Sequence, residues 1–445
     1  MKLDISVVTL FQELYAPFFS TSLIKRAQEQ GLVSCSVSSL FDFVAPKVRV
    51  DAPVAGHGSG MLLKPEVIEK AIEHNERERG RAYKIFFSPH GETLDQDLLN
   101  EIHKQVLEHD GRLMLVPARY EGIDARVESL YADKIVSVGD MVLMGGDVPA
   151  MMLLEGLLRL VPGVVGRQES VIADSFQSAL VDYPHYTEPE TWKGMSVPSV
   201  VKSGNHKELE QWRLKQAAQR TVRYHFDWMR SHKLAADEEK IVKDVVPAHY
   251  VVLMHGDVRL PNDRVGTTSV TSLDIHDVAR SAATYGMTGY YLVTPLEDQQ
   301  KIVRKLLSFW DSEIGKEYNK HRYEALQRVY LQDSLNAVID DVKQREGKEP
   351  LLIATSARAS EYREHHGAIT YGDQGLVWSH DRPVIFLLGT GLGLSHDVLK
   401  QCDFMVPPLY GLSSFNHLSV RSAAAVIFDR WLGMNPKKSF FVSNE

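Results

Sequence analysis

Short apolar runs alternate with helical patterns in the first part of the chain. The runs have the length and composition of buried strands, and the stretches between them place apolar residues at three- and four-residue spacing, as helices do. The runs are Ile5–Leu10, Lys84–Phe87, Leu113–Val116 and Lys134–Val138. This alternation predicts an α/β domain with a mostly parallel sheet over residues 1–162.

The same alternation returns in the second half of the chain. Four further apolar runs predict strands there: Tyr250–Met254, Tyr290–Thr294, Leu351–Ala354 and Val384–Leu388. A charged segment, Asp298–Gly347, lies between the second and third of these runs and predicts a helical insertion. We therefore expect a second α/β domain over residues 248–445.

A polar region separates the two α/β patterns. Gly163–Lys202 contains many polar residues and prolines, which is typical of a linker or a functional loop. Asn205 and Glu208 then have the spacing of a helix capping box, and we expect the helix over Lys207–Arg223. Residues 163–247 are thus predicted to form a linker and a small helical domain.

The charge balance limits how this chain can bind a polyanion. It has 445 residues and a formal net charge of −8, so the whole molecule is not a polycation. Binding to nucleic acid would therefore need a local basic patch. The helix expected over Lys207–Arg223 offers one through Arg213, Lys215 and Arg220.

The cysteines and the apolar segments indicate a cytoplasmic protein. Cys35 and Cys402 lie far apart and in no CxxC arrangement, which disfavours a disulfide framework and a structural zinc site. Met1–Leu10 lacks the basic region and long apolar run of a signal peptide. The most apolar stretch, Met141–Gly166, contains charged residues, so no membrane span is expected.

Two glycine clusters could bring backbone close to a ligand. Gly56–Met61 taken alone is a flexible surface loop. Ser137–Gly146 directly follows an expected strand, and ligands bind at strand ends in open α/β sheets. The alternative is that this segment forms only a strand, a turn and the start of a helix, and binds no ligand. The glycine order matches neither a dinucleotide-binding fingerprint nor a P-loop, which disfavours a nicotinamide dehydrogenase or an NTPase.

Two polar segments carry side chains that could take part in chemistry. Arg119–Asp124 follows the strand expected at Leu113–Val116, and its Arg and Glu could orient a base or form a solvated ion pair with each other. From the residues alone, the ion pair is the better interpretation. Asp174 could act as a general base, or it could cap a helix.

These segments together resemble one family, the TrmD-type tRNA (guanine-N1)-methyltransferases of bacteria. The resemblance covers about residues 1–221 and depends on many motifs in the same order. The motifs are Ser88–Pro89, Arg119–Asp124, Gly145–Gly146, Pro162–Gly163, Asp174–Phe176, Pro184–Thr187, Ser203–His206 and Trp212–Arg213. The resemblance implies a SPOUT fold, in which a deep trefoil knot holds S-adenosylmethionine in a bent shape, and a homodimer whose active site is built from both subunits. It also implies magnesium, which no cluster of residues here indicates.

The resemblance assigns roles to particular residues. Asp174 would be the general base that removes the N1 proton of guanine. Arg159 would stabilise the negative charge that spreads onto O6, and Glu121 would help hold the guanine. The cofactor-binding residues would be Ser88, Pro89, Tyr120, Gly122, Ser137, Val138, Gly139, Met141, Leu143, Gly145 and Gly146.

The chain departs from this family pattern at some positions. His57 interrupts three consecutive glycines, Pro117–Ala118 stands where a glycine usually precedes Arg119, and His90 replaces a glutamine. Met141 and Met144 replace a tyrosine and a serine. Cofactor contacts in this fold come largely from the backbone, so the departures bear mainly on affinity.

A second resemblance covers about residues 248–433. Gly389–Leu394, Pro407–Leu409 and Asn416–Ala423 follow in the order of the cofactor-binding end of SPOUT RNA methyltransferases. The residues that would bind S-adenosylmethionine there are Gly389, Gly391, Gly393, Pro408, Leu409, Leu418 and Ser419. The expected fold is therefore α/β, with two trefoil-knotted SPOUT domains of mostly parallel sheet joined by the small helical domain.

A further motif leaves the chemistry of the second domain open. Arg280–Gly286 resembles the first motif of ribose 2′-O-methyltransferases, but Asp274 stands where that group has an asparagine. Arg280 could contact RNA phosphate, take part in catalysis or cap a helix.

Three hypotheses about function follow. The first is an enzyme that methylates tRNA at N1 of guanosine 37 and carries a second RNA methyltransferase domain of unknown target. In the second, one or both domains only bind RNA or cofactor, and the third is a different nucleotide-dependent transferase. The expected partners are tRNA, S-adenosylmethionine and a second copy of the chain.

Overall fold

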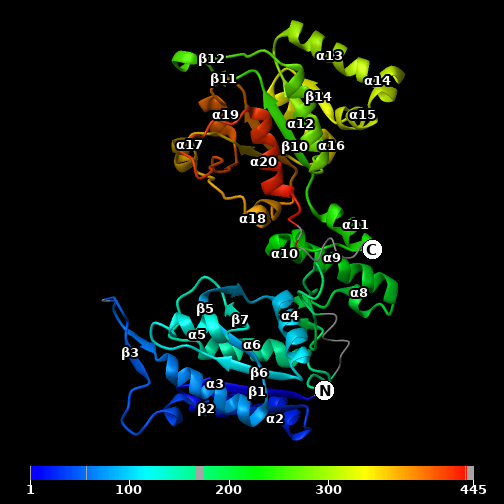
Figure 1. Ribbon diagram of the computed structural model, residues 1–445. Coiled ribbons are helices and arrows are strands. Elements are labelled where there is room, and N and C mark those ends of the chain that lie inside the picture. The colour runs from blue at the N-terminus through cyan, green and yellow to red at the C-terminus, as the bar shows by residue number, and fades with distance from the viewer. Residues whose placement is uncertain (1, 57, 167–173, 436, 438–445) are drawn as a thin grey trace. The chain divides into compact units, whose positions relative to one another are not determined.

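The computed structural model describes residues 2–56, 58–166, 174–435 and 437, and its contacts divide the chain into two compact units (Figure 1). The units span Met1–Gln177 and Ser178–Glu445. Each contains one main sheet in which all neighbouring strands run parallel. The expected α/β class with mostly parallel sheets is thereby confirmed.

The sheet of the first unit has the strand order β2-β1-β6-β5-β7. Its strands are β1 (Leu3–Thr9), β2 (Val33–Ser39), β5 (Tyr83–Thr93), β6 (Arg112–Val116) and β7 (Lys134–Ser137). Its helices are α1 (Tyr15–Phe19), α2 (Ser22–Glu29), α3 (Pro65–Arg79), α4 (Gln96–Glu108), α5 (Ala125–Tyr131) and α6 (Asp147–Leu160). A small antiparallel pair, β3 (Asp51–Pro53) and β4 (Met61–Leu63), lies outside the main sheet.

Helices cover both faces of this sheet. Ile5 and Val7 of β1 belong to a core cluster with α2, α4 and α6. Val8, which points to the opposite face, belongs to a second cluster with α3 and α5. Strands buried on both faces read as continuous apolar runs, which explains why β1 and β6 were recognisable in the sequence.

The sheet of the second unit has the order β14-β13-β10-β16-β15-β17. Its strands are β10 (His249–Met254), β13 (Gly289–Val293), β14 (Val329–Gln332), β15 (Leu351–Ala354), β16 (Val384–Gly389) and β17 (Phe404–Met405). The helices that follow β10 in the chain are α12 (Ser272–Thr284), α13 (Glu297–Asp311), α14 (Glu313–Tyr318), α15 (Lys320–Leu326), α16 (Leu335–Glu346), α17 (Ala359–Glu364), α18 (Gln374–Trp378), α19 (His396–Gln401) and α20 (Val420–Leu432).

Two core clusters again mark the two faces of the sheet. Val251 and Leu253 of β10 pack with α12, α15 and α20, while Tyr250 and Val252 pack with α16 and α19. The helices that precede β10 contribute to the first of these clusters. They are α9 (His206–Tyr224), α10 (Phe226–Arg230) and α11 (Ala236–Val245). The expected helical segment therefore shares a core with the α/β part of its unit.

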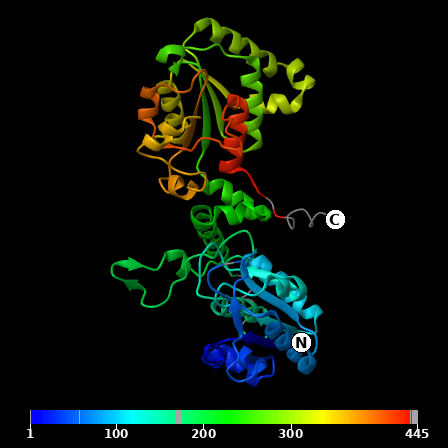
Figure 2. The ribbon, with the colours of Figure 1, turned by 60° about the vertical axis from the view of Figure 1, so that its left-hand side comes forward.

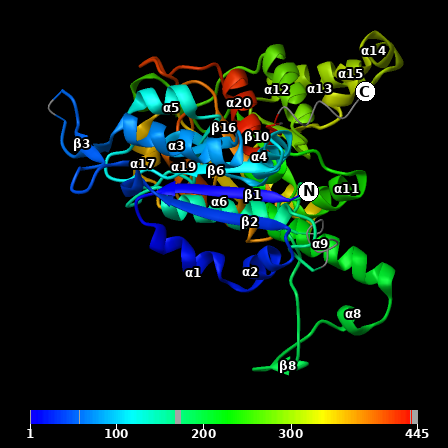
Figure 3. The same ribbon diagram turned by 60° about the horizontal axis from the view of Figure 1, so that its bottom comes forward.

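A small hairpin precedes these helices. Its strands are β8 (Thr191–Trp192) and β9 (Met195–Ser196), and α8 (Ser199–Lys202) follows them. Figure 2 and Figure 3 show the hairpin, labelled β8 in Figure 3, extending away from the helices of its unit. Trp192 and Met195 are exposed on it.

The expected helix after Asn205 is present as α9, with slightly different bounds. The side chain of Asn205 accepts a hydrogen bond from the backbone N–H of Glu208 at 3.3 Å, as an N-cap does. In a capping box the side chain of Glu208 would accept from the backbone N–H of Asn205. Here Glu208 Oε2 accepts from the side-chain amide of Asn205 instead.

The segment Asp298–Gly347 is not wholly helical. Its helices α13, α14, α15 and α16 are interrupted by the strand β14, which pairs with β13 at the edge of the sheet. An edge strand of four residues carries too short an apolar run to be distinguished from its helical neighbours.

None of the helices in the described part of the chain is long and apolar enough to cross a membrane.

Candidate functional site

Two loops of the first unit meet at the carboxyl edge of its sheet. The backbone N–H of Gly146 donates to Ala118 O at 2.8 Å, and Arg119 and Gly145 form an isolated antiparallel bridge. A Cβ atom at Gly145 would lie 2.5 Å from Arg119 Cδ, and one at Gly146 would lie 2.8 Å from Ala118 N. Only glycine allows this approach, so two of the motifs found in the sequence form one structure.

A buried carboxylate, Asp147, holds this junction together. It is the first residue of α6 and has no exposed surface. Its Oδ2 accepts from Arg119 Nε at 2.7 Å, and its Oδ1 accepts from Thr9 Oγ1 at 2.6 Å and from Tyr15 Oη at 3.1 Å. The prediction of a solvated ion pair between Arg119 and Glu121 is therefore wrong. The partner of Arg119 is Asp147, a buried residue from another segment.

Glu121 lies against the first glycine cluster. Its backbone N–H donates to Met61 O at 3.0 Å, and a Cβ atom at Gly60 would lie 2.4 Å from Glu121 Cγ. The adjacent Tyr120 has a positive φ of 58° and is half exposed. The end of this cluster, Gly60 and Met61, thus contacts the same edge. Gly56 and Gly58 are exposed, as in a surface loop, and His57 lies outside the described residues.

The two residues assigned to proton transfer and charge stabilisation are in direct contact. Arg159 Nε donates to Asp174 Oδ2 at 3.0 Å, and a second guanidinium N–H donates to the same oxygen. Both side chains are partly exposed. Asp174 caps no helix in the part of the chain that is described, because turns follow it.

The remaining cofactor-binding residues assigned in the first unit lie at the ends of β5 and β7. Ser88 and Pro89 stand in the irregular final part of β5, where Ser88 Oγ contacts His90 Nδ1 at 2.7 Å. Ser137 Oγ accepts from Gly139 N at 3.3 Å, directly after β7. β5 and β7 are neighbours, so these residues share one edge of the sheet.

Apart from Asp140, the loop between Gly139 and Gly145 is apolar, and it is exposed. Met141 and Leu143 are about half exposed, and Val142 and Met144 are almost fully exposed. Val148 and Met152 continue this apolar surface along α6. We call these six residues the apolar loop surface.

The second unit contains a cavity of about 440 Å³ at the carboxyl ends of β15, β16 and β17. Six of the seven residues assigned to cofactor binding line it: Gly389, Gly391, Gly393, Leu409, Leu418 and Ser419. Among the described residues of the lining, Pro407 takes the place of Pro408.

The glycine loop after β16 is bent tightly under this cavity. Gly391 and Gly393 have φ values of 61° and 100°, which favour glycine. A Cβ atom at Gly389 would lie 2.5 Å from the backbone nitrogen of Leu394. The hydroxyl of Thr390 donates to Met254 O at 2.9 Å, so the loop is also attached to the end of β10.

An ion pair that the sequence did not indicate lies next to the glycine loop and helps to hold it. Arg259 is buried, the side chain of Glu361 is 9% exposed, and the two are in direct contact. Arg259 also binds the glycine loop through its backbone, since its N–H donates to Gly393 O at 2.9 Å and its C=O accepts from Leu392 N at 3.0 Å. Burial raises the pKa of Glu361, but the hydrogen bonds from Arg259 and Ser356 outweigh this and hold the pKa below its usual range.

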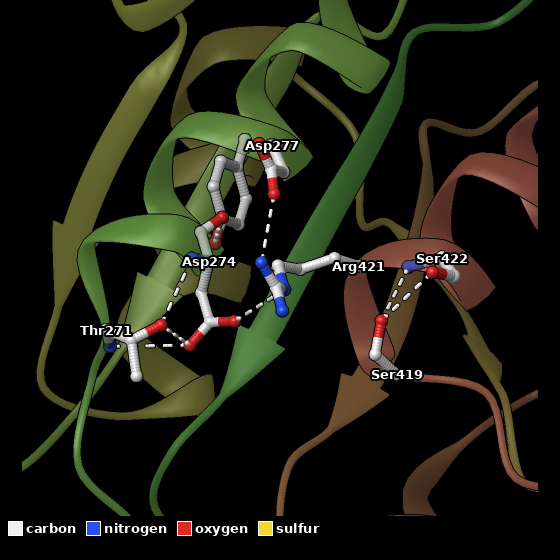
Figure 4. A network of polar contacts seen from close by, with 7 residues as sticks. Thr271, Asp274, Asp277, Ser419, Arg421 and Ser422 are labelled. Carbon is white, nitrogen blue, oxygen red and sulfur yellow. Dashed lines mark hydrogen bonds and ion pairs between the residues drawn. The ribbon is translucent and has the colours of Figure 1, made fainter.

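Asp274 belongs to a network between α12 and α20 (Figure 4). It forms a capping box with Thr271, and its Oδ1 lies 3.7 Å from Arg421 Nε. Arg421 Nη1 donates to Asp277 Oδ2 at 3.0 Å. Figure 4 also shows Ser419 turned toward Ser422, whose N–H its hydroxyl accepts at 3.2 Å as the N-cap of α20. Arg421 thus braces two helices beside the cavity.

The four residues assigned to RNA binding lie on two helices of the second unit. Arg213 stacks on the ring of Tyr183 at 4.7 Å, and Arg220 Nη1 donates to Asp182 O at 3.4 Å. Lys215 is exposed on α9, and Arg280 is exposed within α12.

No group of three or more His, Cys, Asp or Glu side chains in the described part of the chain could hold a metal ion. The magnesium that the resemblance implied stays an expectation, and no chemical step is assigned to it.

A family described as tRNA (Guanine-1)-methyltransferase TrmD matches residues 1–231 of the chain. The chain belongs to this family. A second family, described as SAM-dependent RNA methyltransferase, matches residues 248–433. Both resemblances seen in the sequence motifs are thereby confirmed.

Some proteins named tRNA (guanine-N(1)-)-methyltransferase align with nearly the whole chain, and others align with about half of it. Proteins of that name from Nitratidesulfovibrio vulgaris and Oleidesulfovibrio alaskensis are each 36% identical, over 96% of this chain and 99% of their own. One from Dictyoglomus turgidum is 38% identical and covers 55% of this chain and 96% of its own. The crystal structure of tRNA (m1G37) methyltransferase from Aquifex aeolicus matches at 33% identity and a TM-score of 0.40, over 48% of this chain and 88% of its own.

Sequence reasoning missed several residues of this family member. Asp147 lies in the apolar stretch Met141–Gly166, and its charge was used only as an argument against a membrane span. Arg421 lay inside a quoted motif, Asn416–Ala423, and its charge among small residues was the signal that could have found it. Arg259 and Glu361 lay in no motif.

Proposed function

We propose that the chain transfers a methyl group from S-adenosylmethionine to N1 of guanosine 37 in tRNA, next to the anticodon. Family membership supports the reaction class. The observation that carries the assignment to this chain's residues is the contact between Arg159 and Asp174. It joins a carboxylate that can accept a proton to a cation that can stabilise the negative charge formed when the proton leaves.

The chemistry requires both groups. N1 of neutral guanine carries a proton and attacks a methyl group only when that proton is lost. Asp174 accepts the proton, and the charge that develops on O6 is stabilised by Arg159. Arg159 donates two hydrogen bonds to one oxygen of Asp174, so it can turn one N–H toward O6 and keep the other on the carboxylate. Bound S-adenosylmethionine supplies the electrophilic methyl group.

The junction at Asp147 supports a cofactor site at this edge of the first unit. Tyr120, Gly122, Gly145 and Gly146 lie at or beside this junction, and Glu121 is held against Gly60, where it can hold the guanine. Ser88, Pro89, Ser137, Val138 and Gly139 complete the edge.

The proposal includes a SPOUT fold with a trefoil knot in each α/β domain, and the division of the chain into domains over residues 1–162, 163–247 and 248–445.

The proposal also includes a homodimer. The apolar loop surface supports the dimer, because apolar patches of this kind mark protein contacts. Light scattering at micromolar concentration tests it, and a monomer would contradict an active site shared between subunits. A cytoplasmic location follows from the tRNA substrate.

The second domain is proposed to bind S-adenosylmethionine in the cavity lined by the glycine loop and to methylate RNA. The cavity can hold an adenosine against exposed backbone and apolar side chains such as Leu409 and Leu418. Its RNA contacts would include Arg280.

The test is methyl transfer by the full-length chain to a tRNA transcript, with 1-methylguanosine measured by mass spectrometry of the digested RNA. Asp174→Asn is expected to lower the rate by about a hundredfold to ten-thousandfold, the range for loss of a general base. Glu155→Gln, an exposed change on the same unit, is the matched control. A transcript with adenosine at position 37 should accept no methyl group on N1 of guanine. Wild-type turnover by Asp174→Asn would remove this residue from the base role.

A further inference from the structure

The cavity of the second unit has an unequal distribution of charge. Its described lining contains one arginine, Arg358, and one histidine, His417, but no carboxylate. The rest consists of apolar side chains, hydroxyls, one amide and the glycine loop. A ligand with an anionic group would therefore meet a single permanent cation, at a defined place on the wall.

The backbone around Arg358 is fixed in position. Arg358 follows β15 and stands immediately before α17, and its N–H donates to Ser356 Oγ at 3.0 Å. The neighbouring Ala357 O accepts from Asn416 Nδ2 at 2.9 Å, which ties this segment to the wall that carries Leu418 and Ser419. The side chain of Arg358 itself is 43% exposed and can reach into the cavity.

The charge of Arg358 is only partly compensated. Among the described residues its one ion pair joins Nη1 to Glu361 Oε1, at 3.4 Å. Glu361 is already committed to the buried guanidinium of Arg259 and to the hydroxyl of Ser356 at 2.5 Å. Two arginines thus share one carboxylate, and the group carries a net charge of +1 on the side that faces the cavity.

We propose that Arg358 binds the α-carboxylate of the methionine part of S-adenosylmethionine and so determines the direction in which the cofactor lies. The amino-acid end lies at the end of β15, and the adenosine end lies toward the glycine loop and Leu418. This inference depends on the proposed function of the cavity as a cofactor site. An arginine and a carboxylate form a charge-assisted hydrogen bond that fixes geometry as well as adding affinity.

The test compares two ligands that differ only in the carboxylate. They are S-adenosylhomocysteine and its decarboxylated analogue, S-adenosyl-3-thiopropylamine, which keeps the amine. Each is titrated into the full-length chain, and hydrogen–deuterium exchange is followed in peptides that cover residues 384–394. The exchange of the glycine loop reports on this cavity alone, whatever binds to the first unit.

Arg358→Gln should weaken S-adenosylhomocysteine at this loop by roughly tenfold to a hundredfold, as expected for loss of a hydrogen bond between charged groups. The decarboxylated analogue should bind the variant as well as it binds the wild type, or slightly better, because its amine no longer faces a cation. Arg358→Lys should recover part of the lost affinity. Arg363→Gln, an exposed change on α17 that is not part of the cavity lining, is the matched control and should alter neither ligand.

Each other outcome overturns the inference in a recognisable way. An equal loss for both ligands would mean that Arg358 only supports the cavity wall. An unchanged affinity for S-adenosylhomocysteine, with weaker RNA binding, would make Arg358 a phosphate contact. If S-adenosylhomocysteine gives the wild-type loop no protection, the proposed cofactor site fails, and the role of Arg358 fails with it.

Discussion

Arg119 and Asp147 form an ion pair although they lie 28 positions apart in the sequence, with Nε 2.7 Å from Oδ2. The carboxylate is completely buried and also accepts from the hydroxyls of Thr9 and Tyr15. Burial and the nearby Asp147 raise the pKa of Tyr15, so its hydroxyl remains a donor. Three segments of the first unit thus donate to one buried carboxylate on a fourth.

Asp147→Ala should destabilise the first unit by about 3 to 5 kcal/mol, because it leaves Arg119 and two hydroxyls without their acceptor. The midpoint of urea unfolding measures this loss. Glu29→Gln is the control, since the pair of Lys25 and Glu29 is exposed and its loss should cost below about 0.5 kcal/mol. If Asp147→Ala costs no more than this control, Arg119 has found another partner and the junction does not depend on Asp147.

Gly389→Ala should abolish cofactor binding in the second unit. The added Cβ would lie 2.5 Å from the backbone nitrogen of Leu394, which cannot move unless the glycine loop opens. Titration calorimetry with S-adenosylhomocysteine should show the stoichiometry falling from two sites per chain to one. Gly372→Ala is the matched control, because its Cβ would be 3.7 Å from the nearest atom. Two intact sites in Gly389→Ala would mean that the loop does not bind the cofactor.

Lys215→Ala should weaken tRNA binding and reduce the dependence of the logarithm of affinity on the logarithm of salt concentration by about 0.7 to 1. Lys215 is exposed on α9, so its loss removes charge with little effect on packing. Arg213 is a poorer probe, since it also stacks on Tyr183. Filter binding between 50 and 300 mM salt, values chosen to vary screening, measures the slope. Lys243→Ala, whose ammonium pairs with Glu239, is the control. An unchanged slope for Lys215→Ala would show that tRNA binds elsewhere.

His249 should make the second unit sensitive to acid. Burial lowers its pKa to about 4. Its Nδ1 contacts Pro247 O at 2.6 Å, and its Nε2 faces the indole nitrogens of Trp378 and Trp431 at 3.0 and 3.1 Å. These indoles can only donate, so the ring is neutral in the folded chain.

The sign of the effect follows from this neutral ring. The unfolded histidine has a pKa of 6.5, so below that pH the unfolded chain takes up a proton that the folded chain does not. The free energy of unfolding should therefore fall by up to about 1.4 kcal/mol per pH unit between about pH 6.5 and 4. His249→Gln is less stable than wild type at pH 7, and this difference should shrink at pH 5. Exposed His321→Gln is the control. A difference that does not change with pH would contradict a neutral, buried His249.

The central strands of both sheets could be predicted, while several edge strands could not. β10 and β16 are buried on both faces and form continuous apolar runs. β2, with the sequence VSCSVSS, and β14 lie at sheet edges and expose part of their surface, so their sequences carry weaker apolar signals. Two-residue β17 at the other edge has no periodicity to detect.

The same division holds for the sites. Glycine loops could be located because a tight backbone path demands glycine locally, as at Gly389 and Gly145. The ion pairs at and beside these loops join residues that are distant in sequence. Arg421 and Asp277 are 144 positions apart, and nothing near either residue indicates the other. Such contacts depend on the folded arrangement and not on a local pattern.

Arg259 connects the two ends of the cavity in the second unit. Its backbone holds the glycine loop, and its guanidinium holds Glu361, which also contacts Arg358. We therefore expect an occupant of the glycine loop to restrict, through Arg259 and Glu361, the side chain of Arg358 at the opposite end. We expect adenosine and free methionine, added as separate fragments, to bind with positive cooperativity, because the first fragment removes part of the entropic cost of binding the second.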